Sequence, residues 1–545
     1  MASLAKQINS VSLDTIGVNG IDTQTTATAL SPNWFTKADN VVYTEGGKVA
    51  FRKGLKQKTL TGGAKVGSMV EHYNGTNHLI FAATVGNMYT LDLADKDNAW
   101  TAVFATGAST SDWQFSNFNN QLFAAQYDED LLHYASGSWG LAKNDSGYQA
   151  PAGVTTFNPS TVLGFYGRLW AGGITEENDV LYYSKLLDGH KWGSGNGGII
   201  DLKSVWGHDE IVAVHDFAGK LVIFGKENIV IYNSPDIIAD IVLDEVIRGI
   251  GCVSRDSIQS IGDDLYFLSD TGVRSLFRTT QLDKLPLTEK SITIKDELIA
   301  NINNSTNVKS VFMLNEGLYI ISFVDRNVTY VFDTTFRTEK DTPRITKWMF
   351  SDSRNPASLV YTTDYGLLVG QQSGRVATYE GYYDVDYSGS SVYTYNSYTS
   401  SFSTVWIDLG QGVQSSILKR LVMVVAGGQG TDVGIRLYKD FEMIPKISPT
   451  FKLNPTLSGE PSYWSAPIVD SGATAAKYGP LTGHTHNATT HPAASKYAPI
   501  HGFKERSIPL AGSAKYIRLE WDAVTKGYKA SLQSLSLLFK QGKTL

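Results

Sequence analysis

The sequence predicts an all-β protein in which a β-propeller of six to eight blades is followed by a β-sandwich-like C-terminal domain. Three observations predict this class. Short apolar runs that open with leucine recur seven times, at intervals of 43 to 53 residues. Aromatic residues make up 11% of the 545-residue chain, charged residues 18%, and glycines number 51, a composition typical of short strands joined by tight turns. Beyond residue 402, apolar and polar residues alternate along several runs, as in strands with one solvated face.

Each leucine of the repeat follows a polar or glycine-containing turn and opens a strand. The mean interval of about 48 residues holds four strands, the length of one propeller blade. Runs such as 221–224 are apolar at every position, so we expect them to be inner blade strands buried on both faces. The alternative is two unrelated β-sandwiches, which would not keep a four-strand period over seven modules. The seven leucines are Leu79, Leu122, Leu169, Leu221, Leu265, Leu318 and Leu367.

Composition divides the chain into four segments. The arm over residues 1–32 is polar, and we expect it to be extended and available for docking. The runs on either side of residues 45–47 are predicted to form a hairpin that closes the propeller ring by joining the last blade. The loop 470–499 is too long for a compact connector, which indicates a functional, interacting or flexible loop. The segments are 1–60 (N-terminal arm and hairpin), 61–381 (β-propeller), 382–402 (Tyr/Ser-rich linker) and 403–545 (C-terminal domain, containing the loop).

Charge and cysteine content restrict the function classes. Lys and Arg number 47 and Asp and Glu number 53, which gives a net charge of −6. This charge argues against tight binding of nucleic acid through its phosphates, but it is compatible with a surface along which DNA moves without adhering. Cys252 is the single cysteine, so an internal disulfide is excluded and a reducing cytoplasm is expected. The N-terminal run lacks the apolar core of a signal peptide, and the longest apolar stretch, 421–426, is far shorter than a membrane span. We expect a soluble protein that is made without secretion and is not inserted in a membrane.

Two motifs carry weak signals for ligand binding. His484, His486 and His491 form a His-x-His-x4-His pattern within the long loop. Imidazoles bind transition metals, but this spacing without a rigid scaffold is a weak candidate, and an exposed or inter-subunit loop is the simpler interpretation. The glycine-rich run 193–198 matches the letters of a dinucleotide fingerprint, yet a strand-like run follows it where that motif needs a helix. We interpret this run as a turn.

The remaining candidates are interpreted as structural. Asp92, Asp95 and Asp97 resemble part of a calcium loop, but the glycine and distal glutamate of an EF-hand are absent, which favours a solvated turn. Cys252 lies in an apolar stretch of sequence without a basic neighbour. A nucleophilic cysteine needs such a neighbour to lower its pKa, so we interpret Cys252 as a buried structural thiol. The sequence reveals no set of carboxylates or arginines suited to a catalytic propeller funnel. We expect no enzymatic activity, no catalytic residues and no cofactor.

Two stretches resemble the tail-nozzle proteins of short-tailed bacteriophages, also called tail tubular or packaged-DNA stabilisation proteins. In the first, residues 33–42 read NWFTKADNVV and residues 47–54 read GKVAFRKG. In the second, residues 249–258 read GIGCVSRDSI, residues 262–269 read GDDLYFLS and residues 272–276 read GVRSL. The order of propeller and sandwich is similar as well. These patterns are loose and contain no active-site motif.

The resemblance, best over residues 33–54 and 215–280, implies a homo-hexameric ring below the portal and adaptor in the virion tail, assembled in the bacterial host cytoplasm. Its lumen would retain packaged double-stranded DNA, without sequence-specific binding, and form its exit channel. Fibres or spikes would attach outside. The resemblance assigns no role to the His-bearing loop. Two other classes stay open: a lectin-like carbohydrate-binding propeller, indicated by 28 Tyr and 11 Trp, and a propeller glycosidase, which would need clustered carboxylates.

Overall fold

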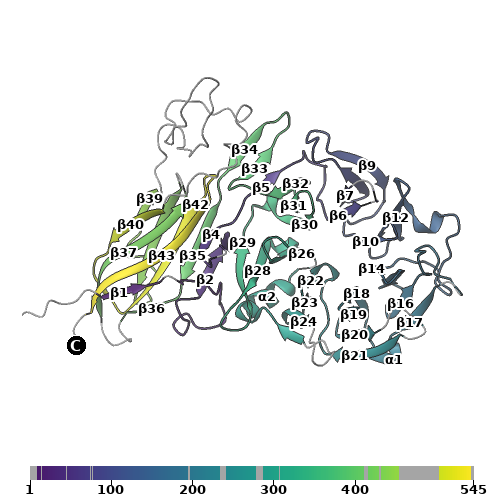
Figure 1. Cartoon of the computed structure of the whole chain (residues 1–545), viewed down its shortest axis with the longest axis horizontal. Coiled ribbons are helices and arrows are strands. Elements are labelled where there is room, and N and C mark those ends of the chain that lie inside the picture. The colour runs from purple at the N-terminus through teal and green to yellow at the C-terminus, as the bar shows by residue number, and fades with distance from the viewer. Residues whose placement is uncertain are drawn as a thin grey trace, which may run out of the picture.

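The structure, a computed structural model, consists of a ring of β-sheets joined to a pair of stacked sheets (Figure 1). The predicted class, an all-β protein with a propeller followed by a sandwich-like domain, is confirmed. The loop 470–499, with His484, His486 and His491, lies outside the described residues. The structure describes residues 9–541 except 14, 45, 74, 76–77, 194, 196, 234–237, 239–240, 278–286, 306, 410–414, 429–430 and 453–502.

Seven antiparallel sheets form the ring within the described part of the chain, one for each leucine module (Figure 1). The first five have four strands each, and these follow one another in sequence. They consist of β6 (Ser68–Tyr73), β7 (His78–Thr84), β8 (Asn87–Leu91) and β9 (Trp100–Ala105); β10 (Gln114–Phe118), β11 (Gln121–Ala125), β12 (Leu132–Ala135) and β13 (Ser138–Leu141); β14 (Thr161–Phe165), β15 (Arg168–Gly172), β16 (Val180–Tyr183) and β17 (Gly198–Asp201); β18 (Ile211–Phe217), β19 (Lys220–Gly225), β20 (Asn228–Asn233) and β21 (Val242–Arg248); and β22 (Gln259–Ile261), β23 (Asp264–Ser269), β24 (Gly272–Phe277) and β25 (Leu287–Glu289).

The sixth and seventh sheets continue beyond the ring into additional strands. Within the ring the sixth comprises β26 (Val308–Met313), β27 (Leu318–Phe323), β28 (Val328–Arg337) and β29 (Pro343–Trp348), and the seventh begins with β30 (Pro356–Thr362), β31 (Gly366–Gln371) and β32 (Val376–Tyr379). No helix in the described segments is long and apolar enough to cross a membrane. The helical elements include α1 (Lys203–Trp206), α2 (Lys295–Ile302) and the 3-10 turns η1 (Ala142–Asn144), η3 (Arg255–Ser257), η4 (Ile292–Ile294), η5 (Val324–Arg326) and η6 (Asp352–Arg354).

The repeated leucines all lie in the second strand of their sheets. Six of them are buried, whereas Leu79 is half-buried. The strands β19 and β27 are buried at every position, as their continuous apolar sequences predict. The first strands are the innermost ones, because β14 packs against β10 and β18, and β30 packs against β26 and β6. The leucine strands thus lie one position farther from the axis than the innermost strands.

The ring is closed by β5 (Leu55–Gln57), which pairs antiparallel with β32 as the outer strand of the seventh blade. The predicted hairpin does form, from β3 (Val41–Tyr43) and β4 (Val49–Phe51). The prediction that this hairpin closes the ring is wrong, because β4 instead pairs with the last strand of the sandwich. Val41, Val49 and Phe51 are buried in the sandwich core, and this apolar burial explains where the hairpin docks.

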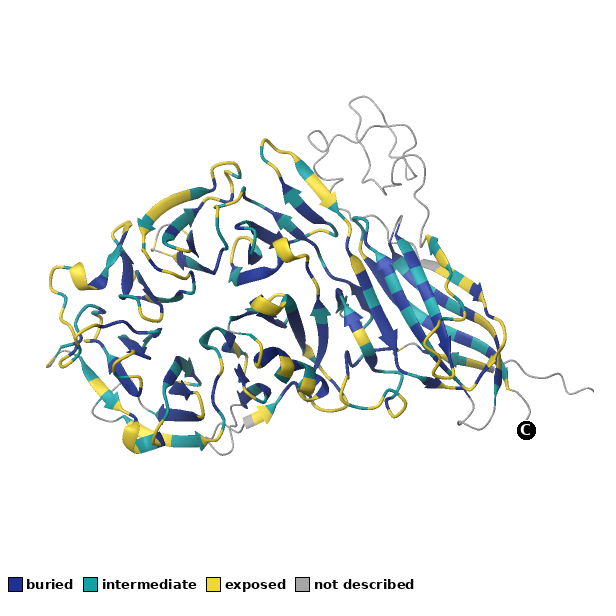
Figure 2. Ribbon diagram, turned by 180° about the vertical axis from the view of Figure 1, so that it is seen from behind, coloured by how far each residue is buried: buried dark blue, intermediate teal, exposed yellow. Residues whose placement is uncertain are grey.

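Two sheets form the sandwich, and N-terminal strands belong to both. One of them continues the sixth propeller sheet through β2 (Phe35–Asp39), so a single ten-stranded sheet runs from the ring into the second domain. Buried and half-buried residues alternate along β42 (Tyr516–Val524), which places one face of this strand in the core. Figure 2 shows buried and intermediate residues alternating in the same way along the strands of the sandwich. In addition to β26–β29, the ten-stranded sheet contains β2, β35 (Thr399–Thr404), β36 (Ile407–Asp408), β38 (Asp432–Lys439), β39 (Thr450–Lys452) and β42. The other sheet of the sandwich has seven strands: β1 (Asn9–Ser12), β3, β4, β37 (Ser416–Gly427), β40 (Phe503–Pro509), β41 (Ser513–Ala514) and β43 (Ala530–Gln541).

The arm and the linker are more structured than the sequence predicts. β1 pairs with β43, and Leu13, Ile16 and Ile21 are buried in the sandwich core, so the described part of the arm is packed and not extended. The segment 382–402 contains a hairpin, β33 (Asp384–Tyr387) and β34 (Tyr393–Asn396), and the start of β35. β33 pairs with β5, so this hairpin extends the seventh sheet and is not a linker.

Candidate functional site

Four charged side chains meet across the propeller ring, at the end where the first strands begin. Asp112 precedes β10, Arg255 and Asp256 belong to η3 just before β22, and Lys309 is the second residue of β26. The second sheet lies across the ring from the fifth and sixth, so contacts among these residues span the axis (Figure 1). We call these four residues the axial cluster.

The two cations of the axial cluster connect four sheets. Lys309 Nζ donates a hydrogen bond to Asp256 Oδ2 at 2.6 Å and another to Asp112 Oδ1. Arg255 donates to the backbone carbonyl oxygens of Ser160, just before β14, and of Asp112. The Lys309 side chain is 6% exposed, whereas that of Asp112 is 44% exposed. The contacts fix the second, third, fifth and sixth sheets to one another at the axis.

The electrostatics of the axial cluster keep Asp112 and Lys309 ionised. Burial would raise the pKa of Asp112, but Lys309 and Arg255 outweigh it and hold that pKa well below its usual range. Burial would lower the pKa of Lys309, but Asp256 and Asp112 outweigh it and raise that pKa. A glycosidase acid needs the opposite, a carboxyl group with a raised pKa. The geometry favours a structural role for this pair of carboxylates.

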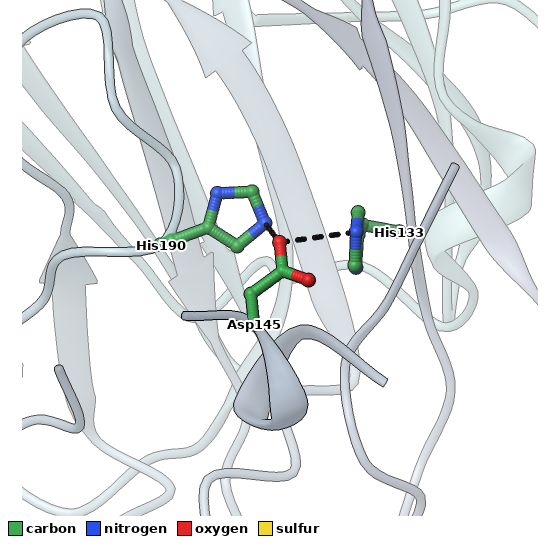
Figure 3. Close-up of side chains that lie close together, drawn as sticks. All are labelled: His133, Asp145 and His190. Carbon is green, nitrogen blue, oxygen red and sulfur yellow. Dashed lines mark ion pairs between the residues drawn. The ribbon is translucent and has the colours of Figure 1, made fainter. Parts of the chain in front are cut away.

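Two histidines and an aspartate form a second group, between the second and third sheets (Figure 3). His133 lies on β12, Asp145 directly follows η1, and His190 lies in the connection between β16 and β17. Asp145 Oδ2 is 3.2 Å from His133 Nε2 and 2.9 Å from His190 Nε2. The two imidazole rings stand edge to face, with centroids 4.8 Å apart. We call these three residues the His–Asp cluster.

Sequence reasoning missed the His–Asp cluster. Its members are separated by 12 and 45 residues and lie on one strand and in two connections, so no local spacing motif joins them. Burial lowers the pKa of His133, and this effect together with His190 outweighs the opposing effect of Asp145. A lowered pKa favours the neutral imidazole, which is the form that binds metal ions.

A cleft of about 1090 Å³ lies between the β3–β4 hairpin and the sixth sheet. Arg344 in its wall packs over the Tyr43 ring, 4.3 Å from the ring centroid, and pairs with Asp333 at 2.7 Å. Lys53 pairs with Glu316 at 2.5 Å in the same wall. Aromatic rings beside a few oriented polar groups are typical of small-molecule sites, so this cleft is a candidate ligand site.

The aspartates that resemble a calcium loop lie in a turn. Asp92 Oδ1 accepts a hydrogen bond from the backbone N–H of Ala94 at 2.9 Å, and Asp97 Oδ1 accepts one from the Tyr387 hydroxyl at 2.7 Å. Across the described segments, Asp92, Asp95 and Asp97 do not form a group close enough to share a metal ion. The glycine-rich run leads into β17, as expected of a turn before a strand.

Cys252 is 1% exposed, and burial raises the pKa of its thiol to about 12. Its Sγ lies 3.2 Å from the Ser254 carbonyl oxygen, to which it donates. We expect native protein at pH 8 to react with Ellman's reagent about 1000-fold more slowly than protein unfolded in guanidinium, because reaction requires an exposed thiolate. Absorbance at 412 nm measures both rates. Release of one thiol equivalent from native protein within seconds would contradict this prediction.

Comparison with known proteins gives likeness at the level of the fold alone. No protein-family model and no curated protein matches the chain. The extracellular domain of a hybrid two-component system from B. thetaiotaomicron is similar over 65% of this chain and 46% of its own, with a TM-score of 0.40 and 10% identity. The WD40 β-propeller domain of Doa1 is similar over 60% of this chain and 96% of its own, with a TM-score of 0.33 and 13% identity. By its own topology the chain is a β-propeller protein.

Proposed function

We propose that this protein is a structural virion subunit, the tail nozzle of a short-tailed bacteriophage. In this role six copies form a ring that retains packaged double-stranded DNA and provides its exit channel. The ring binds the tail adaptor on one side and carries fibres or spikes. The protein acts by assembly and mechanical support, without catalytic turnover.

The observation that carries this proposal is the position of the two stretches that resemble nozzle proteins. Residues 33–54 contain β2, β3 and β4, and they connect the sandwich to the ring-closing strand β5. Residues 249–276 contain η3, whose Arg255 and Asp256 belong to the axial cluster. Both stretches supply buried groups that hold parts of the fold together, which supports a structural function.

The continuity of the ten-stranded sheet supports the same conclusion. β2 pairs with β29 of the propeller on one side and with β35 of the sandwich on the other. A hydrogen-bonded sheet that crosses the junction resists bending between domains better than a flexible linker does. Such a subunit suits a tube that must withstand the pressure of packaged DNA. The net charge of −6 suits a lumen through which DNA slides without adhering.

Native mass spectrometry and negative-stain microscopy test this proposal on the full-length protein, first alone and then mixed with the adaptor and fibre proteins of a short-tailed phage. We expect a six-fold ring, formed by head-to-tail contacts that close on themselves. A protein that stays monomeric in every mixture and never enters tails would contradict the proposal.

A carbohydrate-binding function is the second candidate, because the cleft beside the β3–β4 hairpin combines aromatic rings with oriented charges. A glycan array and a screen of glycosidase substrates distinguish this candidate from the nozzle. Binding of a defined glycan by a monomer would favour a lectin, and turnover would favour an enzyme. A ring-forming protein without glycan binding would favour the nozzle.

A further inference from the structure

We propose that the His–Asp cluster binds one divalent transition-metal ion, which fastens the second propeller sheet to the third. His133 Nε2, His190 Nε2 and Asp145 Oδ2 are the three protein ligands. This inference does not depend on the nozzle proposal, since it concerns only the contact between two neighbouring blades.

The spacing of the three ligand atoms fits a metal ion. Zn²⁺ binds imidazole nitrogen at about 2.0–2.1 Å and carboxylate oxygen at about 2.0–2.2 Å, so ligand atoms around one ion lie about 3 Å apart. The observed separations from Asp145 Oδ2 are 3.2 Å to His133 Nε2 and 2.9 Å to His190 Nε2. Figure 3 shows the same carboxylate oxygen facing both rings.

The hydrogen bonding of the cluster is incomplete without an ion. His190 Nε2 is buried and has no hydrogen-bond partner, although Asp145 Oδ2 is only 2.9 Å away, so the geometry is unsuitable for a hydrogen bond. His133 is only 8% exposed at its side chain, so little water reaches its ring. Buried polar groups in native proteins are nearly always satisfied. An ion bound off the line between nitrogen and oxygen would satisfy His190 Nε2 and the carboxylate together.

The backbone around the cluster holds the ligands in place. The Gln149 N–H donates to the His190 carbonyl oxygen at 2.9 Å, which joins the segment after Asp145 to the segment that carries His190. Gly189 lets this segment approach the second sheet, because a Cβ there would lie 2.6 Å from the Phe123 ring. A site that is fixed before the ion arrives binds it with little loss of conformational entropy.

The donor set defines the class of ion. Two imidazoles and one carboxylate suit Zn²⁺ and similar first-row dications, whereas Ca²⁺ and Mg²⁺ prefer sites built from oxygen. The Asp145 side chain is 41% exposed, so one side of the cluster faces solvent. Water would take the remaining position, as in three-ligand zinc sites.

Zinc binding to the full-length protein tests the site, after the three histidines of the long loop have been replaced so that they cannot bind zinc themselves. The His484→Ala/His486→Ala/His491→Ala background removes the three loop imidazoles. In this background, isothermal titration with ZnCl₂ and elemental analysis after dialysis are expected to give one Zn²⁺ per chain. We expect His190→Gln and Asp145→Asn each to weaken zinc binding by about 100-fold or more, since even outer-shell changes cost 10–100-fold.

Two control variants show whether the loss is specific. His78 also faces carboxylates, in an exposed group with Glu71 and Asp364, so His78→Gln serves as the matched control and should keep full zinc binding. His215 lies outside both groups, and His215→Gln should likewise bind normally. Thermal unfolding confirms that each variant folds, and added zinc should raise the melting temperature of every protein except the two cluster variants.

Three results would overturn the proposal. The first is absence of zinc binding in the background that carries the three loop alanines, which would mean that the His–Asp cluster is only an ion pair. The second is loss of zinc binding in His78→Gln, which would show that zinc binds to the group of Glu71, His78 and Asp364 instead. The third is unchanged affinity in folded Asp145→Asn and His190→Gln.

Discussion

Lys309→Met is expected to lower the free energy of unfolding by about 3 kcal/mol at pH 7. Lys309 is the ammonium that pairs with both Asp112 and Asp256, and its side chain is 6% exposed. Removing one partner of a buried ion pair costs about 3–5 kcal/mol, because the remaining charge is left uncompensated. We expect a loss at the lower end of this range because the Asp112 side chain is 44% exposed, so water can solvate its charge and reduce the cost of leaving it unpaired. Urea denaturation measures the change.

The effect of Lys309→Met should depend on pH in a defined direction. The pKa of Asp112 in the folded protein is held below its unfolded value by Lys309 and Arg255, against the effect of burial. The stabilisation is fully present above the unfolded pKa of about 3.9 and is lost as the pH falls through the folded pKa. The variant lacks the Lys309 ammonium, the larger of the two charges that lower the Asp112 pKa, and so lacks most of this stabilisation. The stability difference between the two proteins should therefore stay constant between pH 7 and about pH 5 and shrink as the pH falls below about 4.

An exposed lysine provides the matched control. Lys143 pairs with Asp130 at 2.7 Å, but its side chain is 49% exposed. Surface pairs contribute about 0–1 kcal/mol, so Lys143→Met should change stability little. Equal losses in Lys309→Met and Lys143→Met would show that the axial cluster has no special stabilising role.

The propeller was predictable because its signal is local. Strands such as Leu221–Phe224 are apolar on both faces, and that pattern follows from burial between neighbouring sheets whatever the distant contacts are. The alternation in β42 likewise predicts a sheet with one buried face. Each of these elements shows its environment within a few residues of sequence.

The parts that sequence reasoning missed depend on distant partners. β5 has only three residues and no readable periodicity, and its partner β32 lies at the far end of the propeller. Leu13, Ile16 and Ile21 stand apart in a polar arm, and only the sandwich core explains their burial. The His–Asp cluster combines a residue of strand β12 with two residues from separate connections of the second and third sheets. Tertiary contacts of this kind leave no local pattern in a single sequence.

Arg52→Met is expected to have the largest effect of the substitutions considered, lowering the free energy of unfolding by about 5 kcal/mol. The Arg52 side chain is fully buried and contacts Asp384, itself 7% exposed, through two nitrogen–oxygen pairs of 3.4 Å. It also donates to Asn40 Oδ1 at 2.9 Å and to the Lys53 carbonyl oxygen at 2.7 Å. The loss lies at the upper end of the range for broken buried pairs, because neither ion of the pair can reach water.

The position of Arg52 explains why one side chain matters so much. It lies between β4 of the sandwich and β5, which closes the ring, and its guanidinium packs 4.0 Å from the Tyr398 ring centroid. Asp384 opens β33 and also accepts a hydrogen bond from the Leu55 N–H of β5 at 3.0 Å. The pair therefore holds the chain where it passes from one domain to the other. Without Arg52, we expect faster hydrogen exchange in β5 and β32 before the rest of the ring opens.

A double variant separates the cost of an unpaired charge from the loss of packing. Arg52→Met/Asp384→Asn removes both charges. The amide oxygen introduced at position 384 can still accept a hydrogen bond from the Leu55 N–H. Replacing both partners of a buried pair costs less than removing one, so the double variant should be about 2 kcal/mol more stable than Arg52→Met. Denaturation midpoints measured in parallel test this. A double variant less stable than Arg52→Met would show that Asp384 stabilises the junction through contacts other than its charge.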